Sequence, residues 1–182
     1  HGRERLCYAI SPRFAPTSSP EQLEACWALR AANRDCIVQT HLSEQTAEIE
    51  WVASLYPDAR DYLDVYDRFG LLDARAVFGH GIHLSSRERA RLAEAGAAVA
   101  HCPTSNAYLG SGACDVAQLR AEGIAVGLGT DTGGGSSFSP FATMRAAYEA
   151  GQAHGKALTP AQLWWLAAPG AARALHMGDT IG

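Results

Sequence analysis

The chain has 182 residues, of which 47% are hydrophobic and 19% charged, as in an ordinary globular protein with a buried core. Its formal net charge of −4 argues against nucleic acid or a membrane surface as a partner. No apolar run approaches the roughly 20 residues that a membrane-spanning helix needs. The chain begins at His1 rather than Met, so we expect a fragment, and the lack of a leader carries little weight.

The cysteine pattern indicates free thiols. The five cysteines are an odd number and form no CxxC pair: Cys7, Cys26, Cys36, Cys102 and Cys114. Several lie in apolar segments, such as Cys7 in LCYAI and Cys36 in CIV. We therefore predict buried, unpaired thiols in a reducing cytoplasm.

Short apolar runs alternate with segments of helical periodicity. The runs predict five strands, near Leu6–Ile10, Cys36–Thr40, Ala76–Phe78, Ala97–Ala100 and Ile124–Leu128. The intervening segments predict helices at Pro20–Ala32, Thr46–Leu55, Tyr62–Phe69, Ser85–Ala95, Val116–Glu122 and Phe141–His154, after Thr159, and at Gly170–His176.

Alternating strands and helices predict an α/β fold with a parallel sheet, and the apolar strands indicate a sheet covered on both faces. A complete (β/α)₈ barrel typically takes about 250 residues. We therefore expect residues 1–182 to form a single domain, the later part of a TIM-type barrel without its N-terminal strands.

A polar, reactive residue follows each predicted strand: Arg13, His41, His80, His101 and Asp131. Barrel enzymes build their active sites at the C-terminal ends of the strands, where such residues meet. Each residue alone has a structural explanation, but their shared position favours one metal site.

Two of these positions have local alternatives. In His41-x-x-Glu44 the imidazole can bind Zn²⁺ and the carboxylate can move protons, although the segment could simply cap a helix. Asp131 precedes three glycines, which allow a close backbone approach, or it could form an Asx-turn. A phosphate-binding loop is excluded because no lysine follows the glycines.

The remaining candidates are less specific. His80 could be a hydrogen-bonded structural residue, and we assign His83 to a loop. His101 could contribute to the pocket or to packing, and packing is favoured. Its segment lacks the PCxxC of nucleobase deaminases that bind zinc through cysteines, which argues against that scheme. Arg13 and Phe14 could hold a planar ring, or they could be a surface arginine beside a core aromatic.

Five segments together carry a family resemblance. In order along the chain, SPRFAP, QTHLSE, FGHGIHL, AHCPTSN and GLGTDTGGGSSFS resemble the guanine deaminases of the amidohydrolase superfamily. The HCPxSN and GTD segments are shared by many deaminases of that superfamily. SPRF with HLSE and the glycine-rich extension is more particular to guanine deaminases.

The resemblance implies a barrel of the metal-dependent hydrolase kind, represented by about its fourth to eighth strands. It also implies one zinc ion, held by an HxH pair, a later histidine and an aspartate. His41 and Asp131 match the last two ligands, and His80 is a further candidate. Glu44, His80 and Asp131 match the catalytic residues, with Glu44 as the proton shuttle.

The implied reaction is hydrolysis of guanine to xanthine and ammonia by a zinc-activated water, in purine catabolism. Arg13 and Phe14, with His41 and Glu44, match the residues that bind the purine. A cytoplasmic homodimer that binds guanine, with no nucleic-acid or membrane partner, is the implied state.

The chain departs from this family because it contains neither the HxH pair nor a glutamine region that helps to bind guanine. These 182 residues alone could not supply all four zinc ligands. Two alternatives stay open: an amidohydrolase deaminase for another purine, a pyrimidine or a triazine, and a catalytically incomplete part-barrel that only binds or packs against a partner.

Overall fold

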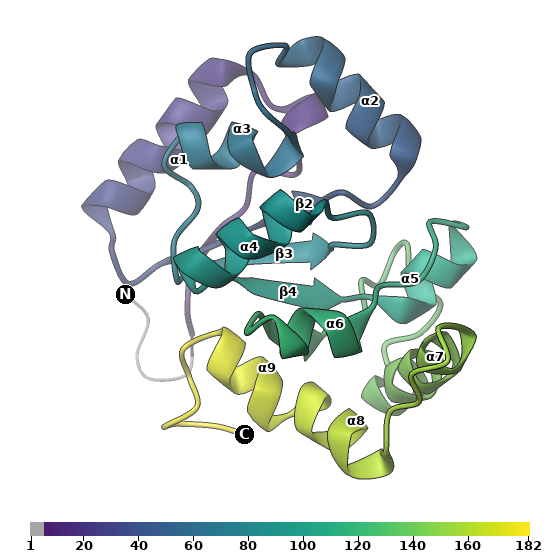
Figure 1. The fold of residues 1–182 in the computed structure, drawn as a ribbon. Coiled ribbons are helices and arrows are strands. Elements are labelled where there is room, and N and C mark those ends of the chain that lie inside the picture. Colours follow the sequence, from purple (N-terminus) through teal and green to yellow (C-terminus); the bar gives the residue numbers. More distant parts are fainter. Residues whose placement is uncertain (1–5) are drawn as a thin grey trace.

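A computed structural model describes residues 6–182 around one five-stranded parallel sheet (Figure 1). The strands are β1 (Ala9–Ile10), β2 (Ile37–Leu42), β3 (Ala76–His80), β4 (Ala98–His101) and β5 (Ala125–Leu128). They lie side by side in chain order without a reversal, as in a barrel segment and unlike a doubly wound sheet. The five predicted strands and their parallel arrangement are confirmed.

The helices agree closely with the predicted ranges. They are α1 (Pro20–Ala32), α2 (Thr46–Leu55), α3 (Tyr62–Arg68), α4 (Ser86–Ala95), α5 (Pro103–Tyr108), α6 (Val116–Ala121), α7 (Pro140–Ala153), α8 (Pro160–Ala167) and α9 (Pro169–Ala174), with a 3₁₀ turn at Ala15–Thr17. Helix α5 was not predicted. In the described part of the chain, no helix has the length and apolar character needed to cross a membrane.

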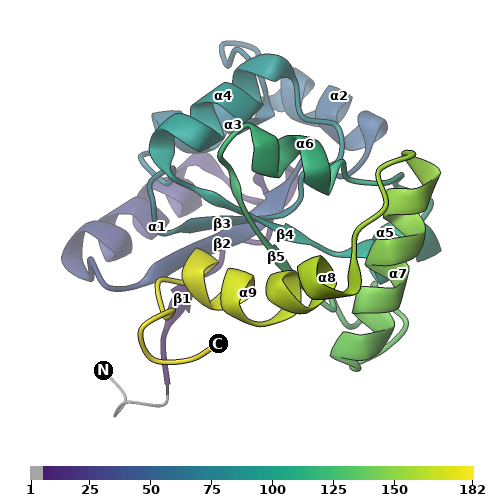
Figure 2. The ribbon, with the colours of Figure 1, turned by 60° about the horizontal axis from the view of Figure 1, so that its bottom comes forward.

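The sheet is buried by different elements on its two faces, as its apolar strands predict. Val38, Phe78 and Val99 belong to the large core beneath the helices. Their strand neighbours point the other way, and Val77 packs in a smaller cluster with Ala174 of α9. Figure 2 shows α4 and α6 on one side of the sheet and α9 on the other.

The first strand is shorter than predicted. Only Ala9–Ile10 pairs with β2, and Leu6 and Tyr8 are 75% and 71% exposed. Strand β1 is the edge of the sheet, so no further described strand covers its outer side. The prediction that Cys7 is buried is therefore wrong, whereas the other four cysteines are buried and all five are free.

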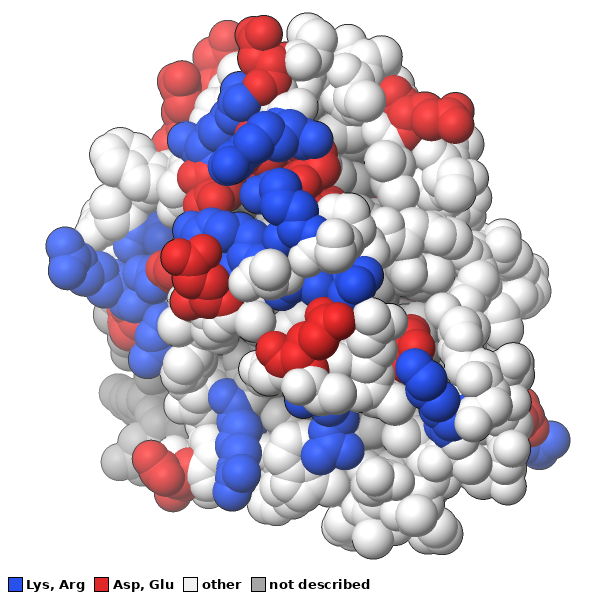
Figure 3. All heavy atoms as spheres, viewed as in Figure 1, with Lys and Arg blue, Asp and Glu red and all other residues white. Residues whose placement is uncertain are grey.

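Charged side chains of both signs gather over α3 and α4 (Figure 3). Arg91 binds Asp67 at 2.7 Å, and Arg87 binds Asp61 across the same two helices. Beneath them Asp64, 1% exposed, accepts hydrogen bonds from Arg60 and Arg68. Burial alone would raise the pKa of Asp64, but the hydrogen bonds and charges of the two arginines outweigh burial and lower it to about 2.

We predict that Asp64→Asn lowers the free energy of unfolding at pH 7 by about 2 kcal/mol. Because the pKa of Asp64 falls from 3.8 to about 2 on folding, this contribution is present above pH 3.8 and lost as the pH falls toward 2. Urea unfolding from pH 7 to pH 2 measures the difference between wild type and variant. Asp58→Asn, at an exposed aspartate, is the control, and a pH-independent difference would contradict the assignment.

The buried thiols should be unreactive. Burial, and then the negative charge of Asp131 or Asp115 respectively, raises the pKa of Cys102 and Cys114 to about 12. Because only the thiolate is nucleophilic, we predict that iodoacetamide at pH 8 modifies Cys7 but neither of these two in the native protein. Peptide mass spectrometry reads each site, and fully denatured protein is the control. Labelling of Cys102 at the rate of Cys7 would show that this buried environment is wrong.

Candidate functional site

The register of the parallel strands brings the predicted strand-end residues together. His41 lies opposite Gly79, and Leu42 lies opposite His80, the last residue of β3. The backbone of His80 leaves strand geometry, with a φ of 70°, and its ring stacks on that of His41, with centroids 5.1 Å apart and planes 23° apart.

The backbone is constrained where the strands end. Ser43, His80 and Asp131 have φ angles of 49°, 70° and 45°, in the left-handed region that side chains other than glycine rarely adopt. Ser43 directly follows β2, His80 is the last residue of β3, and Asp131 lies three residues after β5. Such conformations cost about 1–3 kcal/mol and cluster at functional sites. They turn the chain sharply, so that the polar side chains lie at the rim of the sheet.

A hydrogen bond from Nδ1 of His41 to the backbone of Arg13 orients the His41 ring. Its Nδ1 lies 2.6 Å from the carbonyl oxygen of Arg13, so Nδ1 carries the proton and donates it. The lone pair of Nε2 is then available to a cation. Metal-bound histidines are commonly held by this type of bond. The chemistry of His41 therefore fits a metal ligand.

His80 faces two carboxylates. It is 2% exposed, and its Nδ1 lies 2.8 Å from Oδ1 of Asn106. Its Nε2 lies 3.6 Å from Glu44 Oε2 and 4.0 Å from Asp131 Oδ2. The predicted catalytic residues therefore meet at one point, although they come from three separate strand ends.

Glu44 has its own hydrogen-bond support. Its carboxylate is 15% exposed, and Oε1 accepts a 2.9 Å hydrogen bond from the hydroxyl of Ser111. The amide of Gln45 donates to the same hydroxyl oxygen at 3.2 Å. One carboxylate oxygen is thus occupied by protein, whereas Oε2 faces His80.

The glycine-rich loop closes tightly over Asp131. A Cβ atom on Gly134 would lie 3.0 Å from Asp131 Oδ2 and 2.8 Å from Ser105 Oγ. A Cβ atom on Gly135 would lie only 2.1 Å from the carbonyl oxygen of Thr130. The close backbone approach predicted from the three glycines is therefore present, and the loop approaches the protein's own residues.

An aromatic and cationic wall lies beside His41. The Phe14 ring is 5.7 Å from the His41 ring and meets Trp51 edge-on at 6.5 Å. The guanidinium carbon of Arg13 lies 5.3 Å from the centre of the Phe14 ring. Arg13 is exposed, so its donors are accessible to a ligand. This arrangement suits a flat polar ring.

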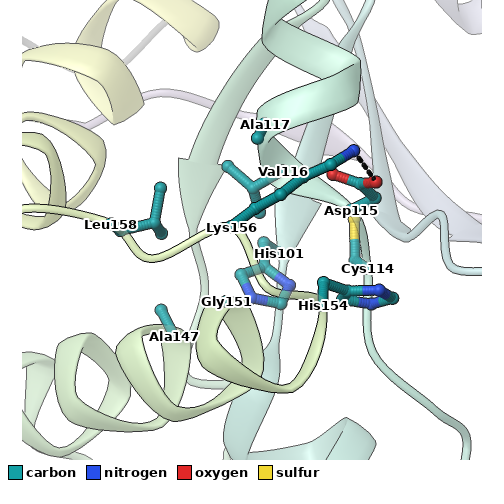
Figure 4. A pocket seen from close by; sticks show the side chains of 10 residues that line it. All are labelled: His101, Cys114, Asp115, Val116, Ala117, Ala147, Gly151, His154, Lys156 and Leu158. Atoms are coloured by element: carbon teal, nitrogen blue, oxygen red, sulfur yellow. Dashed lines mark hydrogen bonds and ion pairs between the residues drawn. The ribbon is translucent and has the colours of Figure 1, made fainter.

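His101 is the one strand-end residue that does not join the cluster. It lies between α6 and α7, next to a cavity of about 10 Å³ that Cys114, Ala147 and His154 also line (Figure 4). Burial, and then the nearby His80 and His154, lowers the pKa of His101 to about 4. It is therefore neutral at pH 7 and packs on the far face. Its grouping with the other strand ends in one metal site is wrong, whereas the packing alternative fits.

Sequence reasoning missed the residues that support the cluster. Asn106 lies in α5 and Ser111 in the turn after it, and both bind predicted site residues. Pro103 is the first residue of α5, and proline is favoured at the first position of a helix, where no backbone donor is needed. That position of Pro103 is the signal that could have revealed α5.

The metal-binding chemistry of the cluster is partial. Within residues 6–182, no group of three or more His, Cys, Asp and Glu side chains is arranged to hold a metal ion. His41 offers a neutral nitrogen, and Asp131 offers a carboxylate that is 31% exposed. Nitrogen and oxygen donors of this kind suit zinc. His41 and Asp131 therefore fit part of the ligand set of such a site.

Comparisons with known proteins agree with this arrangement. A model of the amidohydrolase family matches residues 2–182. The guanine deaminase of Escherichia coli strain K12 is 45% identical over the whole of this chain, which spans 42% of the length of that protein. A solved structure of the E. coli guanine deaminase superposes on the whole chain with a TM-score of 0.98.

Two further solved structures bear on ligands. Guanine deaminase from C. acetobutylicum, with guanine bound in its active site, is 33% identical with a TM-score of 0.87, over 94% of this chain and 42% of its own. An adenosine deaminase from Xanthomonas campestris with bound zinc is 30% identical with a TM-score of 0.86, over 94% of this chain and 39% of its own.

Proposed function

Because the chain belongs to the amidohydrolase family, we propose that it forms part of the catalytic barrel of a guanine deaminase. The observation that carries the proposal is the meeting of Glu44, His80 and Asp131 in a chain 45% identical to the E. coli guanine deaminase. The reaction is guanine plus water to xanthine plus ammonia. Residues 1–182 supply the later strands of one domain, and the remainder of the barrel completes it.

Zinc is the metal that the donors of His41 and Asp131 suit. His41 Nε2 and the Asp131 carboxylate would hold it, with His80 beside them as a further candidate. The zinc in the related adenosine deaminase structure supports this choice. When bound, zinc makes a nucleophile available from water at neutral pH.

The chain's own residues handle the protons. The Asp131 carboxylate accepts a proton from the attacking water, and His80 Nε2 orients that water between the two carboxylates. Glu44 protonates ring nitrogen N3 as the C2–oxygen bond forms, so negative charge does not accumulate on the ring. The proton that Asp131 took from the water then passes to the leaving amine. The new C2 hydroxyl returns a proton to Glu44 as ammonia departs, which leaves the C2 carbonyl of xanthine and restores both carboxyl groups.

The wall of Arg13 and Phe14 holds the purine. The guanidinium of Arg13 donates to the O6/N7 edge, and the Phe14 ring limits movement of the base. His41, whose ring lies 5.7 Å from that of Phe14, and Glu44 complete the proposed purine site. Guanine rather than another ring is the proposed substrate because the E. coli protein, 45% identical over the whole of this chain, is a guanine deaminase.

A cytoplasmic location and a role in purine catabolism accompany this proposal. The free thiols support a reducing compartment. A homodimer without nucleic-acid or membrane partners stays a prediction from the resemblance.

We predict that Glu44→Gln in the full-length protein retains zinc but loses turnover of guanine by about 10²–10⁴-fold in kcat. The amide keeps the shape of the side chain but cannot carry the proton. Ammonia release measures kcat, and metal analysis measures zinc. Glu50→Gln, at an exposed position of α2, is the control. Near-normal turnover in Glu44→Gln would remove Glu44 from the mechanism.

Substrate binding is tested separately through Arg13. Arg13→Ala should raise KM for guanine by about 10- to 100-fold, because it removes charge-assisted hydrogen bonds to the ring edge. Arg34→Ala, at the opposite end of β2, is the control and should leave KM unchanged. An unaltered KM in Arg13→Ala would favour a deaminase for another ring.

A further inference from the structure

The segment from α5 through the following turn, residues 103–112, contacts all three strand ends that form the site. Each contact is one hydrogen bond: Thr104 Oγ1 to the Thr130 carbonyl at 3.3 Å, His80 Nδ1 to Asn106 Oδ1 at 2.8 Å, and Ser111 Oγ to Glu44 Oε1 at 2.9 Å. Two of these contacts hold the side chains of His80 and Glu44, and the third holds the backbone next to Asp131. The sheet register fixes only the backbone positions. The segment therefore controls where the reactive atoms point.

The bond from Ser111 has a defined direction. The Gln45 amide nitrogen donates to the Ser111 oxygen, so that oxygen already accepts one bond. The hydroxyl's own proton is then directed to an acceptor, and Glu44 Oε1 is the acceptor within reach. Ser111 is 5% exposed, so water competes weakly for this bond. The three groups form a short chain that ends on a carboxylate.

The turn that carries Ser111 is itself anchored. The Ser111 carbonyl lies 2.9 Å from His83 Nε2, and its amide donates to the Asn106 carbonyl at 2.9 Å. Gly110 and Gly112 on either side have φ angles of 68° and 113°, which let the chain reverse there. The backbone of Ser111 is therefore fixed, and this sets the position of its hydroxyl. Residue His83, predicted only as loop, is one of the groups that fix it.

We propose that Ser111 is a positioning residue that binds Glu44 Oε1, leaving Oε2 as the oxygen that exchanges the proton with the substrate. This inference rests on the proposed deaminase function. Without the hydroxyl, the carboxylate rotates about its terminal bond, and Oε2 no longer holds its place 3.6 Å from His80 Nε2. Ground-state binding of the purine does not use this bond, so the loss falls on kcat rather than on KM.

The test compares Ser111→Ala, which lacks the hydroxyl, with Ser111→Thr, which retains one. In the zinc-loaded full-length protein, Ser111→Ala should lower kcat for guanine by about 10- to 100-fold, the range for a hydrogen bond to a charged group. KM, zinc content and Tm should stay close to wild type. Ser111→Thr should recover most of the lost kcat. Ser54→Ala removes an exposed hydroxyl on α2 that bonds only its own helix, and should change none of these.

Crystal structures of the wild-type protein and Ser111→Ala give a readout that does not need activity. The expected result is one Glu44 orientation in the wild type and a rotated or multiple orientation in the variant. An unchanged Glu44 orientation, or unchanged kcat in Ser111→Ala, would overturn the positioning role, as would a kcat loss that Ser111→Thr does not recover. Failure of the wild-type protein to deaminate guanine would instead overturn the proposed function, leaving the structural comparison to decide the role of Ser111.

Discussion

The parallel pairing of β2 with β3 is the constraint on which the site depends. Its register sets His41 opposite Gly79 and Leu42 opposite His80. The left-handed backbone of His80, with a φ of 70°, then brings its ring to within 5.1 Å of the His41 ring. A slip of one residue would turn His41 toward the helical core and leave Glu44 without a partner on β3. The core residues of these strands, such as Val38 and Phe78, oppose that slip because it would expose them. Burial on one face of the sheet thereby sets the chemistry on its rim.

Register alone does not orient the reactive atoms. The segment of residues 103–112, which lies between β4 and β5, provides that orientation. Its hydrogen bonds reach the side chains of His80 and Glu44. Buried or nearly buried donors and acceptors in such a network are effective only when their partners are satisfied. The site thus combines a parallel sheet with strained turns at Ser43, His80 and Asp131. Side-chain hydrogen bonds then orient the imidazole of His80 and the carboxylate of Glu44.

Much of this could be predicted from the sequence, because the signals were local. Capping boxes at Ser85 and Thr159 marked helix starts that the structure contains. Strand-end placement grouped His41, His80 and Asp131, since parallel strands end at one edge.

The rest depended on tertiary contacts. Asn106 and Ser111 bind residues 26 and 67 positions away, so no local pattern identified them. His101 follows its strand as the others do, but alternation turns its side chain toward α6 and α7.

The most direct test of the central claim is turnover of guanine by the full-length protein before and after removal of metal. The account predicts equal amounts of xanthine and ammonia with zinc, and none without it. A fully zinc-loaded, folded protein that leaves guanine unchanged would contradict it.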